Sequence, residues 1–174
     1  LAQPGASKIA NMSLTRLDPA PPGQALLDRA VMALITAGIP VVVAAGNSAA
    51  DARLYSPARI AAAITVGAMS GDEVATSSNT GEGVDIYVQG ADVPSASLTD
   101  SCGFERMSGT SMAAARVTGA AADLLANGTA AQDVLPGLLA RSSRQETGNF
   151  SGELTRFVLG LREGDLAGFC DGKA

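Results

Sequence analysis

The stretch Pro40-Val41-Val42-Val43-Ala44-Ala45-Gly46-Asn47-Ser48 decides the fold. Its five consecutive apolar residues have the length of a strand, and an unbroken apolar run is typical of a strand that is covered on both faces of a parallel sheet. The run ends abruptly at a glycine and the polar amide of Asn47. We therefore expect a central parallel strand with Asn47 at its carboxyl end, where functional groups lie in such sheets.

On both sides of this stretch, short β-type runs alternate with longer helical ones, which indicates an α/β fold with a mainly parallel sheet. Apolar runs bounded by turn residues predict further strands at 7–12, 63–67 and 84–88 and a short edge strand at 92–97. Apolar residues at helical spacing predict helices at 24–37, 110–125 and 131–140. Pro136 should interrupt the last helix or delay its start. The tail at 160–174 is expected to be weakly structured.

Length and composition indicate one domain, spanning residues 1–174. The chain is 47% hydrophobic, and its 12 basic and 17 acidic side chains give a net charge of −5. No basic block is present to follow a phosphate backbone, so nucleic acid is not expected as a partner. The most apolar stretch, 31–46, is shorter than a bilayer span and is interrupted by polar residues, glycine and proline, so no membrane helix is expected.

The chain contains no histidine. Histidine is the commonest general base and the commonest transition-metal ligand, so no histidine-dependent catalysis can be complete within these residues. The only lysines, Lys8 and Lys173, lie near the two ends of the sequence and are poor candidates for a lysine-based dyad.

Two segments carry possible chemistry. At the end of the apolar strand, Asn47 has a side-chain N–H that can stabilise a developing oxyanion, although Gly-Asn is also common turn chemistry. Farther along, Ser111 follows Gly109-Thr110 in the first turn of an expected helix. A serine among unpaired helical N–H groups can serve as a nucleophile, but a helix N-cap is the commoner role.

Together the two segments resemble a known family. The run Gly109-Thr110-Ser111-Met112-Ala113 resembles the Gly-Thr-Ser-Met-Ala signature of subtilisin-like serine peptidases. In the same order as in that family, Val42-Val43-Ala44-Ala45-Gly46-Asn47 looks like its oxyanion segment, and the residues between are similar to the proteinase K branch. The resemblance runs from about Ile9 to Leu125. It implies a three-layer α/β/α fold that is incomplete on its N-terminal side, with residues 1–174 forming the C-terminal part of a peptidase domain.

The resemblance also implies roles for individual residues. Ser111 would be the nucleophile of a serine endopeptidase that works through an acyl-enzyme, and Asn47 would donate to the oxyanion together with the Ser111 backbone N–H. A polypeptide substrate would pair with one extended segment, and its P1 side chain, which precedes the scissile bond, would lie against another. The first segment is Ser13, Leu14 and Thr15, and the second, one wall of the P1 pocket, is Ala44, Ala45 and Gly46.

This chain departs from the family pattern at several positions. The family's Asp-Thr-Gly and His-Gly-Thr-His motifs, which carry the other two triad residues, are absent. The residues as given should therefore be close to inactive unless an upstream segment or another chain supplies Asp and His. Thr15 and Arg16 stand where the family has two glycines, and Ala115 and Arg116 stand where it has Pro-His.

These departures leave two alternatives open. One is a non-catalytic relative that keeps the fold as a peptide-binding or regulatory module. The other is an unrelated doubly wound domain that binds a small anion at a helix N-terminus.

No cofactor is required by this chemistry, but the resemblance implies a structural calcium site. In the proteinase K branch one Asp and two backbone carbonyls bind the ion, and the matching residues are Asp85, Ala61 and Ala63. The alternative is that Asp85 merely caps or solvates a strand end.

The family resemblance favours a secreted or periplasmic protein. The sequence shows no signal peptide and begins Leu-Ala-Gln-Pro, so its start is expected to be internal. Cys102 and Cys170 could form one disulfide or remain separate thiols.

Overall fold

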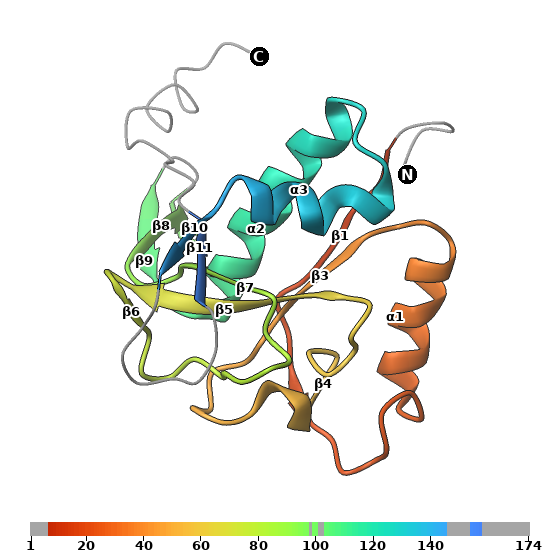
Figure 1. Cartoon of the computed structure of the whole chain (residues 1–174). Helices are drawn as coiled ribbons and strands as arrows, with labels where there is room; N and C mark the ends of the chain where they lie inside the picture. Colours follow the sequence, from red (N-terminus) through yellow and green to blue (C-terminus); the bar gives the residue numbers. More distant parts are fainter. Residues whose placement is uncertain (1–6, 98, 101–102, 146–153, 158–174) are drawn as a thin grey trace.

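A computed structural model describes residues 7–97, 99–100, 103–145 and 154–157. Its centre is a twisted sheet in which the strands of the chain's middle lie side by side (Figure 1). In spatial order the strands are β1 (Ala10–Met12), β3 (Val41–Ala44), β5 (Ile64–Ser70), β7 (Ile86–Gln89), β11 (Leu154–Phe157) and β10 (Ser143–Gln145), with β6 (Glu73–Val74) paired to β5. The pairs from β1 through β11 are parallel, and only β10 and β6 run antiparallel to their neighbours.

Strand β3 confirms the prediction of a central strand buried on both faces. Its residues alternate between two hydrophobic cores, as the twofold period of a strand requires. Val42 and Ala44 pack in one core, and Val41 and Val43 in the other. All four residues are at most 2% exposed.

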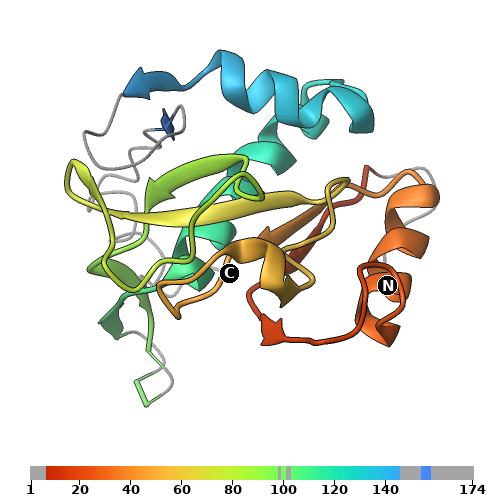
Figure 2. The same ribbon diagram turned by 60° about the horizontal axis from the view of Figure 1, so that its bottom comes forward.

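The helices form the two outer layers. Helix α2 (Thr110–Ala126) packs across β5, β3, β7 and β1, and α3 (Val134–Ala140) lies on α2. On the other face of the sheet, α1 (Leu26–Thr36) packs through Val31 against β3. Figure 2 shows the chain from a second direction, with α1 set apart from the α2–α3 pair. The predicted three-layer α/β/α fold is confirmed.

Helix α2 comes close to the sheet because its buried face consists largely of alanine, as its sequence predicts. Ala113, Ala114, Ala120 and Ala121 are all buried against the sheet strands in a single core. Asn127 is the C-cap, and Gly128 follows at a φ of +89°, so the predicted end of the helix is confirmed.

Two small two-stranded sheets and two short 3-10 helices complete the described chain. Strand β2 (Arg16–Leu17) pairs with β4 (Tyr55–Ser56), and β8 (Val93–Ala96) pairs with β9 (Phe104–Met107). The 3-10 helices are η1 (Ala52–Leu54) and η2 (Ala131–Asp133). The strand expected at 92–97 is therefore present as β8, but it pairs with β9 apart from the main sheet.

Other predicted boundaries differ from the structure by a few residues. The first strand begins at Ala10 rather than at residue 7. Helix α3 starts only at Val134, so Pro136 falls in its first turn, where a missing N–H costs no helical hydrogen bond. Cys102, Cys170 and the tail at 160–174 lie outside the described residues. In the described part of the chain no helix is long and apolar enough to cross a bilayer.

Candidate active site

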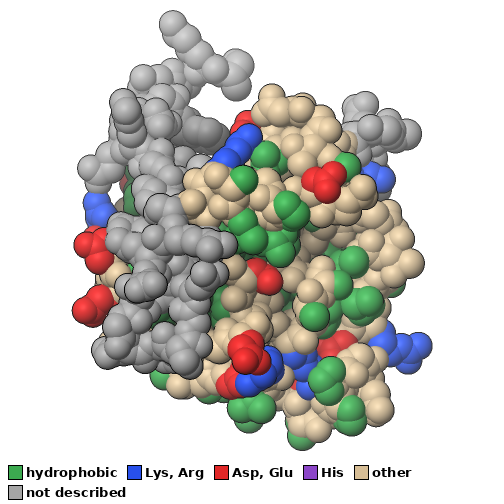
Figure 3. Space-filling view, viewed as in Figure 1, with side chains coloured by type: hydrophobic (Ala, Val, Ile, Leu, Met, Phe, Trp, Pro, Cys, Tyr) green, Lys and Arg blue, Asp and Glu red, His purple; other side chains and the backbone are tan. Residues whose placement is uncertain are grey.

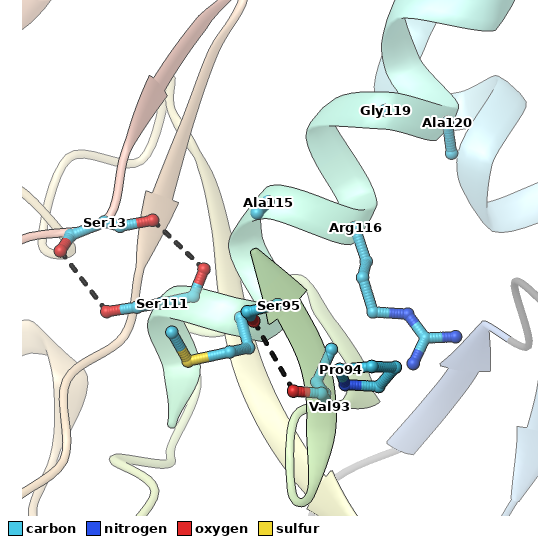
Figure 4. Close-up of a pocket in the computed structure, with 10 residues that line it drawn as sticks. Ser13, Val93, Pro94, Ser95, Ser111, Ala115, Arg116, Gly119 and Ala120 are labelled. Atoms are coloured by element: carbon cyan, nitrogen blue, oxygen red, sulfur yellow. Dashed lines mark hydrogen bonds between the residues drawn. The ribbon is translucent and has the colours of Figure 1, made fainter. Parts of the chain in front are cut away.

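Ser111 lies at the start of α2, where the helix meets the segment that continues strand β1. Its Oγ donates to the Ser13 carbonyl at 3.3 Å, and the Ser13 Oγ donates back to the Ser111 carbonyl at 3.0 Å (Figure 4). These two hydrogen bonds join residues that are 98 positions apart in the sequence. The structure thus brings together the expected nucleophile and the first residue of the expected substrate-binding segment.

The N-terminus of α2 presents an unpaired donor beside Ser111. Gly109 is the N-cap residue and provides no side-chain cap, and Met112 N–H bonds back to the Gly109 carbonyl at 3.1 Å. Among the described residues no hydrogen bond uses the Ser111 N–H. First-turn N–H groups carry the positive end of the helix dipole, so this donor can stabilise an anion that forms at Ser111.

The Asn47 amide is held in one orientation by Thr110. Its Oδ1 accepts from the Thr110 N–H at 2.9 Å and from the Thr110 Oγ1 at 3.1 Å. Because a backbone N–H can only donate, the atom facing it must be the amide oxygen, and the Nδ2 donors must point away from Thr110. The Thr110 Oγ1 in turn accepts from the Gly46 N–H at 3.1 Å, so its single proton is left for Asn47.

Gly109 is required by this arrangement. Its φ of +149° is rarely open to residues with a side chain, and a Cβ there would lie 3.2 Å from the Asn47 Nδ2. The Asn47 amide nitrogen therefore lies against the glycine that precedes Thr110 and Ser111. The two expected oxyanion donors, Asn47 Nδ2 and Ser111 N–H, are brought to the same end of α2.

A second asparagine, Asn79, supports the loop that carries Asn47. It is fully buried, its Oδ1 accepts from the Ser48 and Ala50 N–H groups at 2.9 and 3.2 Å, and its Nδ2 donates to the Ala45 carbonyl at 2.8 Å. A Cβ on Gly46, where φ is +108°, would collide with the Asn79 Nδ2. Sequence analysis assigned Asn79 no role in this loop, because only the fold brings it there from 32 positions downstream of Asn47.

The expected wall of the P1 pocket is made of backbone. Ala44 is 2% exposed and Ala45 is fully buried, with both side chains packed in the hydrophobic cores, so neither methyl group faces a ligand. Across from them, Leu14 is 51% exposed, whereas Thr15 is half-buried. A Cβ placed on Gly46 would lie 3.0 Å from the Thr15 Oγ1, so these two segments approach each other closely.

A cavity of about 420 Å³ opens beside Ser111 on the outer side of α2 (Figure 4). The small residues Ala115, Gly119 and Ala120 form its helix wall. The half-buried Arg116 guanidinium extends from α2 along its edge, and loss of hydration lowers the pKa of this group. The rest of the lining comes from Ser13, Val93, Pro94, Ser95, Ser111 and Met112.

The residues around Ser111 include no general base. The cavity lining contains no Asp or Glu, and the chain has no histidine, so none is seen on the face in Figure 3. On that face apolar side chains are scattered among polar ones, and acidic and basic side chains lie against each other near the lower edge. Ser111 is consequently a hydroxyl with an oxyanion site but without a partner in the described residues that could take its proton.

Asp85, the expected calcium ligand, is the residue directly before strand β7. Its Oδ2 accepts from the Thr65 N–H at 2.7 Å, and burial raises the pKa of this carboxyl. The two carbonyl groups expected as its partners belong to Ala61, which is exposed, and to Ala63, which is buried. No group of three or more His, Cys, Asp or Glu side chains that could hold a metal ion is found in the described part of the chain.

Comparison with known proteins finds a family model and several serine proteinases that match this chain. Residues 1–157 match the peptidase S8 family model, described as the subtilase family. An extracellular serine proteinase of Thermus sp. (strain Rt41A) is 55% identical over 97 residues, which cover 55% of this chain and 24% of that protein. Alkaline serine exoprotease A of Vibrio alginolyticus is 34% identical over 168 residues, covering 94% of this chain and 30% of that protein.

A solved structure is similar over most of the described fold. The crystal structure of a cold adapted subtilisin-like serine proteinase superposes with a TM-score of 0.77 at 34% identity, covering 89% of this chain and 56% of that one. The chain thus spans less than a third of the length of the two relatives above and little more than half of this structure.

Proposed function

The chain belongs to the subtilase family, and from that premise we propose that it carries the nucleophile and the oxyanion site of a secreted serine endopeptidase. The observation that carries the proposal is the Asn47 amide, fixed by Thr110 so that its Nδ2 lies at the same helix end as the unpaired Ser111 N–H. Two donors beside a serine hydroxyl can stabilise the oxyanion that forms in acyl transfer. The Thermus relative is named as an extracellular proteinase, which supports secretion.

In the proposed reaction the Ser111 Oγ attacks the carbonyl carbon of a peptide bond. A base takes the hydroxyl proton as the C–O bond forms, and the carbonyl oxygen becomes an oxyanion that Asn47 Nδ2 and the Ser111 N–H stabilise. The C–N bond then breaks, the leaving amine receives the proton from the base, and the acyl group remains on Ser111. Water hydrolyses this ester by the reverse sequence of proton transfers.

The base must come from outside these residues, because the chain has no histidine. We propose that a polypeptide segment carrying the family's Asp and His, either upstream in the same protein or in another chain, docks in the cavity beside Ser111. The cavity has Ser111 at one end and the small residues of α2 along its wall, so a helix could approach closely there. The partial coverage of the relatives is consistent with such a missing segment.

The polypeptide substrate would bind along residues 13–15. Extended backbone pairs with substrate regardless of sequence, which suits an endopeptidase. In the structure, the Ser111 Oγ donates to the Ser13 carbonyl and the Ser13 Oγ donates to the Ser111 carbonyl. For the reaction, the Ser111 hydroxyl must therefore give up its bond to Ser13 and donate to the base instead.

A fluorophosphonate probe tests the proposal, because it reacts with an activated serine and not with an ordinary hydroxyl. The 174-residue chain alone should remain unlabelled. The same chain joined to a subtilase segment with Asp-Thr-Gly and His-Gly-Thr-His motifs should be labelled at Ser111 and should cleave casein. The Ser111→Ala variant is the matched control. A folded joined protein that is neither labelled nor active would refute the proposal.

The alternative of a non-catalytic peptide-binding module rests on a separate observation. Arg116 borders the cavity at a position where the family has His, so the surface that should receive the base is altered in this chain. If this reading is right, the joined protein binds extended peptides, Ser111→Ala does not change that binding, and no cleavage occurs.

We also propose a structural calcium site at Asp85, with the Ala61 and Ala63 carbonyls as partners. A carboxylate whose pKa is raised by burial gains from a cation, and oxygen ligands suit calcium. Millimolar calcium should then raise the melting temperature of the protein but not that of Asp85→Asn. An equal rise in both proteins would exclude this site.

A further inference from the structure

We propose that Thr15 narrows the P1 pocket and restricts this peptidase to small P1 side chains such as alanine, an inference that rests on the function proposed above. The relevant space lies between two chain segments at the carboxyl end of the sheet. One segment continues β1 and the other continues β3. Both lead to the candidate site, the first through Ser13 and the second through Asn47.

The register of the sheet sets these segments opposite each other. Strands β1 and β3 are parallel neighbours, and their last paired residues are Met12 and Val43. Carried forward by the same register, Thr15 is level with Gly46. Pairing between the strands has stopped by then, so Thr15 and Gly46 face each other beyond the paired part of β1 and β3, at the end of the sheet where Ser111 lies.

Thr15 occupies this space. Its side chain is half-buried although its neighbours Leu14 and Arg16 are exposed, so Thr15 turns toward the protein where they turn away. The Thr15 Oγ1 lies 3.0 Å from the point where a Cβ on Gly46 would be, which is closer than ordinary van der Waals contact. At this level the opening is therefore already filled by the threonine side chain.

Neither side of the opening can easily give way. On one side, threonine is branched at Cβ and has few χ1 rotamers, so it cannot withdraw as a long flexible side chain could. On the other side, Gly46 is held by its N–H bond to Thr110 and is backed by the buried Asn79 amide. Because the wall at Ala44 and Ala45 is backbone with its methyl groups in the core, no side chain there can rotate to make room.

The consequence is a shallow pocket. A P1 methyl group needs little depth, whereas a leucine or phenylalanine side chain would have to pass between Thr15 and Gly46. A glycine at position 15 would leave the opening clear, because it removes every atom beyond Cα. Thr15 is thus the residue of this chain that decides how large a P1 side chain can be.

The experiment uses the joined protein described above and peptide p-nitroanilides that differ only in P1, with Ala, Leu or Phe. The wild-type protein should prefer P1 Ala to P1 Phe by about tenfold or more in kcat/KM, the scale on which pockets discriminate by size. Thr15→Gly should raise kcat/KM for P1 Phe by about tenfold or more and leave P1 Ala nearly unchanged. Thr15→Ser, which removes one methyl group, should fall between them.

Active-site titration with the fluorophosphonate separates the possible failures. Thr76→Gly, at an exposed turn, is the matched control and should leave the P1 preference unchanged. If the protein is labelled but cleaves P1 Phe as well as P1 Ala, or if Thr15→Gly is labelled and keeps the wild-type ratio, the inference is overturned while the proposed function stands. If no variant is labelled, the proposed function fails and the inference fails with it.

Discussion

The position of the Asn47 amide depends on side chains from two distant parts of the chain, Thr110 and Asn79. Thr110 fixes the direction of the Asn47 amide, and Asn79 fixes the loop from which that amide projects. All three hydrogen bonds of the Asn79 side chain go to backbone groups of residues 45–50, and Asn79 is fully buried. Its removal would leave these groups without partners in a place that water does not reach.

We predict that Asn79→Ala lowers the free energy of unfolding by about 2–4 kcal/mol, because buried donors and acceptors lose their partners and a cavity forms. Asn127→Ala is the control. Asn127 is exposed and bonds only within its own helix end, so the loss there should be about 1 kcal/mol or less. Chemical denaturation of the joined protein and of the two variants made in it measures both values, and equal losses would contradict the role assigned to Asn79.

At this scale the sequence predicted the residues that belong to a local pattern. Ser111 follows a glycine at a helix start and Asn47 ends an apolar strand, so neighbouring residues identify both positions. The supporting contacts could not be predicted, because Asn79 reaches the loop at 45–50 and Thr15 reaches Gly46 only after the strands have paired. Their effect depends on distances, which sequence spacing does not contain.

At the scale of elements, α1 is tied to the loop before it and to the segment after β4 by one buried carboxylate. The Asp28 Oδ2 accepts from the Gly23 N–H at 3.0 Å and from the Arg59 Nε at 2.9 Å, and its Oδ1 accepts from the Ser56 Oγ at 2.5 Å. Arg59, whose side chain is 3% exposed, also donates to the Asp18 and Ala20 carbonyls. This network fixes the loop that follows β2 and, through it, the course of the chain beyond residues 13–15.

The pKa of Asp28 reflects this network. Burial alone would raise it, but hydrogen bonds from Ser56, Gly23 and Arg59, together with the Arg59 charge, hold it below its ordinary value of 3.8. A carboxyl whose pKa is lowered on folding stabilises the folded state above the unfolded pKa, and this stabilisation is lost as the pH falls through the folded pKa.

We predict that Asp28→Asn destabilises the protein by about 3–5 kcal/mol at pH 7, since it leaves the buried Arg59 charge with only the more distant Asp18 carboxylate, 3.9 Å away. The difference from the wild-type protein should shrink as the pH falls below 3.8, where the wild-type carboxyl also begins to be protonated. Asp133→Asn, at an exposed position, is the control and should change stability by about 0.5 kcal/mol or less. Denaturation curves of the joined protein and its variants between pH 3 and pH 7 measure the effect, and a difference independent of pH would contradict it.

Among the elements, those with a strong apolar period were predicted and those without one were not. The apolar runs predicted the strands β3, β5 and β7, and apolar residues at helical spacing predicted the helices α1 and α2. Strand β9 was missed because Phe-Glu-Arg-Met has no alternation and is exposed along its whole length. Strands β2 and β4 have two residues each, so only their pairing defines them.

At the scale of the whole molecule, the β1 edge of the sheet lies next to the face of α2 that lines the cavity. In the described part of the chain β1 is the terminal strand of the sheet, and the cavity beside Ser111 lies along α2, which packs against β1. An unpaired strand edge and an apolar cavity both favour association with another polypeptide. We therefore expect the 174 residues alone to unfold with low cooperativity and to aggregate, whereas the joined protein should melt in one sharp transition.

Gly119 allows docking at this surface to be separated from folding. It lies in the middle of α2, lines the cavity, and a Cβ added there would meet nothing within 4 Å. Gly119→Ala should therefore stabilise the chain by about 1 kcal/mol through helix propensity alone. A leucine at the same position should be tolerated by the chain itself but should fill the space into which the segment carrying Asp and His is proposed to dock.

We accordingly predict that Gly119→Leu weakens reconstitution by a separately expressed Asp- and His-bearing segment, so that about tenfold more of it is needed for half-maximal labelling of Ser111. That ratio corresponds to about 1.4 kcal/mol, a modest loss for a side chain that obstructs an interface. Ala126→Leu, at the exposed last residue of α2, two turns beyond Gly119 and outside the cavity lining, should behave like the wild-type protein and controls for added bulk on the helix. Labelling of Gly119→Leu at the wild-type segment concentration would mean that the segment binds elsewhere, and the free β1 edge would then be the surface to alter next.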